Sequence, residues 1–128
     1  MGDYAKKNLR DVEDAAVKGG FSETQAARFA GRDLGCEAIG LALEEVKPGR
    51  RQAFGHRHEE DEEVYVILQG SGRMRLGEET IEVAPMDAIR VDPGVMRAFE
   101  AGAEGLEVLA FGTHHDGDGE IDPGFWPE

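Results

Sequence analysis

The chain has 128 residues, the length of one ordinary domain, and such a domain buries roughly two-thirds of the surface that its unfolded chain exposes. It carries 27 acidic residues against 14 basic ones, giving a net charge of −13. Its field therefore repels polynucleotides and anionic membranes, so neither nucleic acid nor a membrane surface is expected as a partner.

Cysteine content and hydropathy indicate the compartment. Cys36 is the only cysteine, which excludes an internal disulfide and fits a reducing environment. No apolar run approaches the ~20 residues needed to span a membrane, and the opening residues lack the apolar core of a signal peptide. We therefore expect a cytoplasmic protein.

The segment 1–36 is expected to be a short irregular or helical extension that packs on the rest of the chain. Ser22, with Gln25 three residues later, forms a capping-box pattern that predicts a short helix over 23–29. An edge strand over 27–34 explains the same residues equally well.

From Glu37 onward the chain divides into short apolar runs separated by turn signals, a pattern typical of all-β sandwiches and barrels. The predicted strands are 37–46, 64–68, 73–76, 80–83, 88–91, 97–100 and 106–111. The first of them places Ile39, Leu41 and Leu43 on one face, and 73–76 with 80–83 reads as a hairpin. With 18 glycines and five prolines to turn them, the strands predict a jelly-roll-like barrel over 37–112.

Residues 113–128 form a tail rich in glycine and acidic side chains. Phe125 and Trp126 lie near its end and are expected to pack on the barrel or on a second subunit. With the extension and the barrel, the tail completes a single-domain chain.

The chemistry-bearing residues concentrate between Gly49 and Gly70. His56 and His58 stand two apart, so on a strand both imidazoles point to the same face. An acidic run, 59–63, follows, and then an apolar run that reads as the next strand. One of those carboxylates can begin that strand and face the histidines.

These residues resemble the first motif of the cupin family. Its glycine, His-x-His, glutamate and closing glycine match Gly49, His56, His58, Glu63 and Gly70, with a first spacer one residue longer than usual. The resemblance covers about residues 37–111 and implies a cupin-type jelly-roll barrel.

The resemblance further implies that His56, His58 and Glu63 are ligands of a divalent metal ion, such as iron, manganese, nickel or zinc. Six residues separate Glu63 from the closing Gly70, as in the family. Glu62 would face the opposite side of the strand, so Glu63 is the expected ligand.

The second cupin motif is degenerate here. Pro93 and Gly94 keep its turn, but Arg97 stands where the family has its fourth ligand, a histidine. Met86 and Ala101 replace the glycine and the asparagine at its ends. A guanidinium has no lone pair to offer a metal, so Arg97 cannot act as the missing ligand.

Three arrangements of Arg97 follow. In the first, two histidines and one carboxylate hold a metal with open positions, and Arg97 pairs with a metal-bound anionic substrate. In the second, Arg97 pairs with Glu63 in place of a metal. In the third, Arg97 turns to solvent, and His114 or His115 supplies the ligand.

The neighbouring residues have expected roles of their own. Tyr65 alternates with Glu63 along the strand, so it either lines the pocket or packs in the core. The other acidic residues of the run, Glu59, Glu60, Asp61 and Glu62, are expected to form a solvated loop.

The function expected from these residues is the binding of a divalent metal, and of a small anionic metabolite that Arg97 and Tyr65 contact. One alternative is a metal-dependent enzyme, either a dioxygenase or a sugar isomerase, although no motif selects between them. A second alternative is a metal-free ligand-binding or interaction module closed by a Glu63–Arg97 ion pair. Resemblance to small cupins also predicts a homodimer.

Overall fold

The computed structural model describes residues 2–127, and strands dominate this part of the chain. The strands are β1 (Gln25–Phe29), β2 (Ile39–Val46), β3 (Gly55–His58), β4 (Glu63–Leu76), β5 (Glu79–Val83), β6 (Ala88–Val91), β7 (Arg97–Thr113) and β8 (Gly119–Asp122). The helical elements are the 3-10 turn η1 (Leu9–Asp11) and the short α-helices α1 (Ala15–Gly19) and α2 (Gly31–Leu34). None of the helices in 2–127 is long and apolar enough to cross a membrane.

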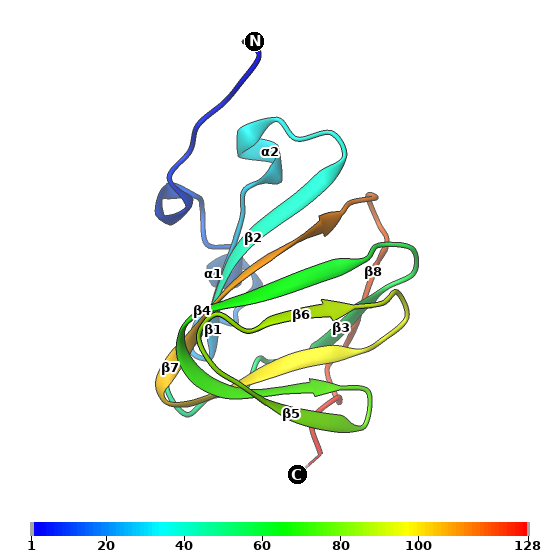
Figure 1. The fold of residues 1–128 in the computed structure, drawn as a ribbon. Helices are drawn as coiled ribbons and strands as arrows, with labels where there is room; N and C mark the ends of the chain where they lie inside the picture. The colour runs from blue at the N-terminus through cyan, green and yellow to red at the C-terminus, as the bar shows by residue number, and fades with distance from the viewer. Residues whose placement is uncertain (1, 128) are drawn as a thin grey trace.

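The strands form one antiparallel sheet that curls into a barrel (Figure 1). Along its main path the order is β1-β2-β7-β3-β8, while β4 pairs with β5, β6 and β7. The two longest strands, β4 and β7, pair over most of their length, with register shifts next to Gln69 and between Gly70 and Gly72. Such irregularities increase strand bending, which lets one strand follow the wall of a barrel. The predicted all-β barrel is confirmed.

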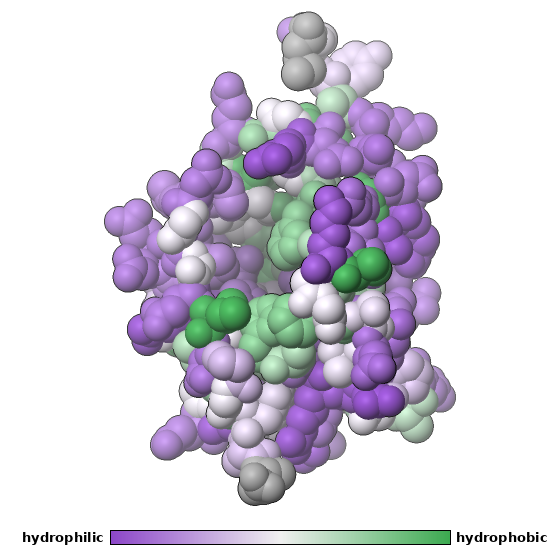
Figure 2. Space-filling view, turned by 180° about the vertical axis from the view of Figure 1, so that it is seen from behind, coloured by the Kyte–Doolittle hydropathy of each residue, from purple (hydrophilic) through white to green (hydrophobic). Residues whose placement is uncertain are grey.

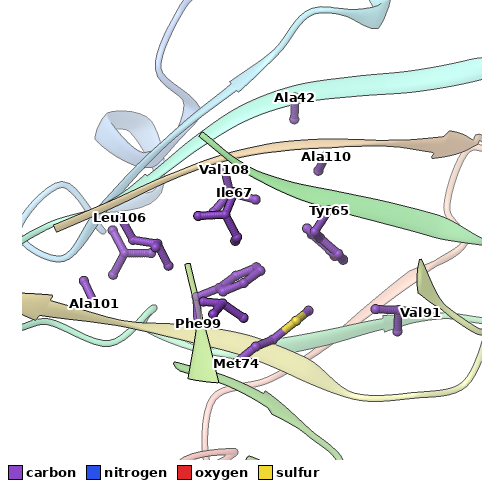
Figure 3. Packing of buried hydrophobic residues seen from close by; sticks show 12 residues of the cluster. Ala42, Tyr65, Ile67, Met74, Val91, Phe99, Ala101, Leu106, Val108 and Ala110 are labelled. Carbon is purple, nitrogen blue, oxygen red and sulfur yellow. The ribbon is translucent and has the colours of Figure 1, made fainter. Parts of the chain in front are cut away.

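The hydrophobic core fills the barrel between β4 and β7. Figure 3 shows Ile67 and Val108 pointing inward from these strands, together with Tyr65 and Phe99. Each of the four is at most 1% exposed. The Tyr65 and Phe99 rings meet edge to face with centroids 5.3 Å apart, a favourable geometry for aromatic pairs. This core anchors the strands that carry the candidate site.

Strand β2 turns a mixed face toward the barrel interior. Ile39, Leu41 and Leu43 do share one face, as predicted, but the core takes Ala42 and Val46 from the other. Glu44 lies between these two residues on the inward face and is 9% exposed. The strand therefore delivers a carboxyl group to the interior.

The predicted helix over 23–29 is wrong. Residues Gln25–Phe29 form β1, which pairs with β2 from Gln25 opposite Val46 to Phe29 opposite Ala42. The Gln25 side chain, expected to cap a helix, is buried and accepts a hydrogen bond from the Ala53 N–H at 2.7 Å. A tertiary contact has replaced the local capping interaction. The edge-strand alternative over 27–34 is only partly right, because α2 begins at Gly31.

The tail packs on its own barrel. Strand β8 pairs with β3, and Phe125 is 8% exposed, with its ring over the Arg75 guanidinium. The Trp126 indole N–H donates to the Gln52 carbonyl oxygen at 2.9 Å. The expectation that these aromatic residues pack on the barrel is confirmed, so they no longer argue for a second subunit. The homodimer stays a prediction.

Candidate metal centre and ligand pocket

Strand β3 carries the two histidines of the site. His56 and His58 lie on one face of the strand, with ring centroids 5.4 Å apart. On one side β3 meets the start of β7, where His56 is paired with Arg97, and on the other side it pairs with β8. Both imidazoles are about one-fifth exposed, at 23% and 20% of their side-chain surface. They are therefore held in place yet accessible.

Glu63 is the first residue of β4 and faces both histidines. Its Oε1 atom lies 3.6 Å from His56 Nε2 and 3.6 Å from His58 Nε2. The preceding residue, Glu62, points to solvent with 57% of its side chain exposed. The structure thus brings together the three residues predicted from the motif, and it favours Glu63 over Glu62.

Arg97 is buried beside Glu63 and has no exposed surface. Its Nη2 donates to Glu63 Oε1 at 2.5 Å, its Nε donates to the Tyr65 hydroxyl at 3.0 Å, and its Nη1 donates to the Val95 carbonyl at 2.9 Å. The arrangement in which Arg97 turns to solvent is therefore wrong, because three hydrogen bonds hold the guanidinium inside.

Neither histidine of the tail joins the three site residues. His114 Nε2 lies 3.0 Å from Asp116, and His115 Nδ1 lies 2.6 Å from Asp61. Both rings are more than half exposed. The hydrogen bond to Asp61, followed by the charge of that carboxylate, raises the pKa of His115. The idea that one of them replaces the fourth ligand is not supported by the geometry.

Tyr65 links the ion pair to the histidines. Its hydroxyl donates to Glu63 Oε1 at 2.5 Å and lies 3.3 Å from His56 Nε2. Burial raises the pKa of the Tyr65 phenol well above its usual value, and the neighbouring Glu63 carboxylate adds to the rise. The phenol therefore keeps its proton and serves as a donor.

Glu63 is ionised despite its burial. Burial opposes the charge, but the side chains of His56, Tyr65 and Arg97 outweigh that effect and lower the pKa of Glu63 to about 2. With such partners the carboxylate keeps its negative charge, and its oxygen atoms are held in one orientation. Because Tyr65 and Arg97 are buried and do not line the pocket, they are placed to hold Glu63. Their predicted contact with a substrate stays a prediction.

Two carboxylates stand behind His58. Its Nδ1 is buried and makes no hydrogen bond within the described part of the chain, but Asp118 Oδ2 lies 3.5 Å away and Asp61 Oδ2 lies 3.9 Å away. Asp118 also accepts the backbone N–H groups of Glu59, Glu60 and Asp61. Carboxylates in this position orient histidine ligands in metal sites.

The acidic run is only partly a solvated loop. Asp61 is 1% exposed and accepts hydrogen bonds from the Thr113 hydroxyl and the His115 backbone N–H, both at 3.0 Å. The expected solvation is therefore wrong for Asp61, although Glu59, Glu60 and Glu62 are exposed. The run of like charges concealed one carboxylate with a structural role.

A pocket of about 470 Å³ opens above the three site residues. Its polar floor includes His56, His58 and Glu63, and its walls carry apolar side chains from α1, β1 and β2. Figure 2 shows a hollow in one face of the molecule, with apolar surface along it and hydrophilic surface around it. The volume is within the range of small-molecule sites, about 300–1,000 Å³.

Glu44 is a pocket residue that the sequence did not reveal. Gln52 Nε2 donates to its Oε1 at 3.0 Å, and the Gln52 Oε1 accepts the Phe99 backbone N–H at 2.9 Å. Burial raises the pKa of the Glu44 carboxyl, while the nearby His56 opposes the rise. Its only sequence signal was its place two residues from Ala42 and Val46, which are apolar residues on the same face of β2.

The three site residues fit a divalent metal ion. Ligand atoms 3.6 Å apart suit an ion that holds nitrogen and oxygen at about 2.0–2.2 Å. The pair of carboxylates behind His58 also matches the outer shell that such ligands need. Arg97 competes with a metal ion for Glu63, because its guanidinium already donates to Glu63 Oε1 and carries the same sign of charge as the ion. The donor atoms and spacing of the three residues therefore fit a metal ion, while Arg97 already occupies Glu63 Oε1.

Comparisons with known proteins agree with this fold. The cupin domain family matches residues 42–112, so the chain belongs to the cupin family. The membership that the first motif predicted is confirmed. Among curated proteins, none matches the sequence.

Solved structures show the same fold. A cupin protein from Bacteroides fragilis is 20% identical with a TM-score of 0.72, covering 91% of this chain and 89% of its own. The polyketide cyclase RemF from Streptomyces resistomycificus is 23% identical with a TM-score of 0.75, covering 97% and 87%. A putative sugar phosphate isomerase from Acidithiobacillus ferrooxidans is 23% identical with a TM-score of 0.63, covering 72% and 60%. At these identities the likeness concerns the fold alone.

Proposed function

We propose that this cupin binds a divalent metal ion through His56, His58 and Glu63 and holds a small oxygen-containing molecule next to it in the pocket. The observation that carries the proposal is the position of Glu63 Oε1, 3.6 Å from the Nε2 atoms of both histidines, at the floor of an open pocket. A metal in such a site polarises a ligand oxygen as a Lewis acid.

The remaining residues position the three ligands. Arg97 and Tyr65 both donate to Glu63, which keeps the carboxylate ionised and directed at the histidines. Asp118 and Asp61 lie behind His58 and favour the tautomer with a proton on Nδ1, which leaves Nε2 free as a ligand. Neighbouring side chains thus keep Glu63 ionised and leave His58 Nε2 unprotonated, which are the states that metal binding requires.

Metal titration tests the proposal. Protein purified without an affinity tag would be analysed for its metal content and titrated with iron, manganese, nickel and zinc by calorimetry. The parent should bind at least one of these ions, and His56→Ala should lose that binding. The matched control is His114→Ala, since this exposed histidine lies outside the trio and should leave the affinity unchanged.

The second candidate is a metal-free binding module, and the 2.5 Å contact between Arg97 Nη2 and Glu63 Oε1 favours it. Arg97→His distinguishes the two. If the parent binds no metal and the variant gains binding, the ion pair has replaced the metal and the first proposal fails. If the parent binds, the variant should bind about tenfold more tightly or better, because a fourth ligand replaces a repelling charge.

An enzymatic role would use the same site. A trio of two histidines and one carboxylate leaves coordination positions open, which is the arrangement of non-haem iron oxygenases. Oxygen uptake by iron-loaded protein with a panel of thiols and diketones would support the dioxygenase reading. Sugar isomerisation is the weaker reading, because the pocket residues within 2–127 include no lysine or arginine to hold a phosphate.

A further inference from the structure

The upper part of the pocket is built from aromatic and aliphatic side chains. Phe21 and Phe54 meet edge to face there, with ring centroids 5.0 Å apart. Phe29 and Ile121 also line the pocket, although 59% and 58% of their surface is exposed. Large apolar side chains that remain exposed around a cavity gain free energy when an apolar ligand covers them.

The charges around the pocket disfavour an anionic ligand. Four acidic residues line it, namely Glu44, Asp61, Glu63 and Glu120, and no lysine or arginine of the described chain does so. Arg97 has no exposed surface and does not line the pocket, and three of its donors are bonded to Glu63, Tyr65 and Val95. Without a metal at the floor, a phosphate or sulfonate would therefore find no cationic lysine or arginine among the pocket residues of the described chain.

Glu44 supplies a polar anchor within this apolar enclosure. Its Oε1 accepts from Gln52, whereas its Oε2 has no hydrogen-bond partner among residues 2–127. Glu44 is only 9% exposed, and one of its two oxygen atoms lacks a hydrogen bond. A ligand hydroxyl that donates to this oxygen would offset the cost of burying it unpaired.

We propose that the pocket takes a flat, uncharged aromatic molecule that bears a hydroxyl group, with its rings against Phe21 and Phe54 and its hydroxyl hydrogen-bonded to Glu44. This ligand class deepens the proposed function and rests on it in one respect, since the same pocket holds the three metal-ligating residues at its floor. The contacts with Phe21, Phe54 and Glu44 do not themselves require a metal.

Three probes with one ring system test the ligand class. Binding of 2-naphthol, 2-methylnaphthalene and naphthalene-2-sulfonate would be measured at neutral pH by probe fluorescence. Measurements would use metal-loaded protein and protein in EDTA. In EDTA, where no metal ion can attract the sulfonate, we expect 2-naphthol to bind about tenfold more tightly than either of the other probes. One hydrogen bond to Glu44, or one avoided charge, supplies a difference of this size. Equal affinities, or preference for the sulfonate, would overturn the proposal.

Pocket variants locate the contacts. Phe54→Ala should weaken 2-naphthol binding about tenfold, and Glu44→Leu should abolish the preference for 2-naphthol over 2-methylnaphthalene. The controls are Phe111→Ala and Glu45→Leu, whose side chains are exposed and lie outside the pocket. Both should bind as the parent does. If Glu44→Leu does not fold, Glu44→Gln replaces it and should keep the preference, because an amide still hydrogen-bonds.

The two proposals fail separately. Preference for 2-naphthol that persists in EDTA supports the ligand class even if metal titration of the parent finds no site. Conversely, a parent that binds metal but not 2-naphthol, with or without the ion, retains the metal centre and overturns the ligand class.

Discussion

The two cupin motifs of this chain differ in what they have retained. The first, from Gly49 to Gly70, keeps its ligand side chains, and the structure gathers them within 3.6 Å of one carboxylate oxygen. The second, from Met86 to Ala101, keeps its turn and its place opposite β3, but a guanidinium occupies the ligand position. The backbone of a motif can thus keep its strand pairing when a ligand side chain is replaced, because strand pairing depends on backbone atoms and metal binding on side-chain atoms.

The largest expected effect concerns the closing glycine of the first motif. Gly70 has φ of 83°, and an added Cβ would overlap the Gly105 carbonyl oxygen. Gly94, in the second motif, has φ of 88° but open space around it. Gly70→Ala should therefore lower the free energy of unfolding by on the order of 4 kcal/mol or more, and Gly94→Ala by about 1 kcal/mol. Urea denaturation measures both, and equal losses would contradict the packing argument.

The ion pair between the motifs gives the next effect. Glu63→Ala would leave Arg97 charged and buried, so the free energy of unfolding should fall by about 3 kcal/mol in metal-free protein. Glu62→Ala is the matched control. The Glu62 carboxylate is exposed, and its ion pair with the exposed Arg90 is long, at 3.7 Å. That control should change stability by less than about 0.5 kcal/mol.

Acid should remove the same interaction gradually. The folded-state pKa of Glu63, about 2, lies below its ordinary value of 4.5. Its contribution to stability is therefore complete above pH 4.5 and is lost as the pH falls toward 2. In EDTA, the stability difference between the parent and Glu63→Gln should narrow over this interval. A difference that stays constant would show that the Glu63 charge is not responsible.

A smaller effect is expected on metal affinity when a residue behind a proposed ligand is changed. Asp118→Asn keeps the shape of the side chain but removes the charge near His58 and weakens the hydrogen bonds from 59–61. Metal affinity should fall about tenfold, as for other outer-shell substitutions. Asp116→Asn serves as the control, because the Asp116 side chain is fully exposed and its one hydrogen bond within the described chain is to His114. Calorimetric titration compares the two variants.

The smallest effect is a gain. Met86 has φ of 74°, the only positive φ of a non-glycine residue within 2–127, and it is 79% exposed. It stands where the second cupin motif has glycine, so the backbone has kept a conformation that its residue disfavours. Met86→Gly should raise stability by about 1 kcal/mol, whereas Met86→Ala, which keeps a Cβ, should not.

Much of the barrel followed from the sequence because its signals are local. Period-two alternation and turn residues predicted the strands, and the same alternation distinguished Glu63 from Glu62. His56 and His58 lie on one face of β3, as their spacing predicted, because the alternation along a single strand needs no tertiary information. The position of Arg97 opposite them required only the second motif's turn.

The errors arose where distant contacts decide the structure. Gln25 accepts from Ala53 rather than capping a helix, and β8 exists because β3 offers it an edge. Asp61 was expected to be solvated like its acidic neighbours, but it is buried because Thr113 and His115, more than 50 residues away in the sequence, donate to its carboxylate. Glu44 was overlooked for the same reason, since nothing in its own strand shows that Gln52 and a pocket adjoin it.

The single tryptophan gives this molecule a built-in optical reporter. The Trp126 indole is bonded to the Gln52 backbone and stacked 4.8 Å from the Arg51 guanidinium, while the Gln52 side chain holds Glu44 at the pocket wall. Its emission should therefore change when the tail detaches from the barrel. Detachment of residues near the C-terminus and changes in the pocket wall become visible in one spectrum, without a label.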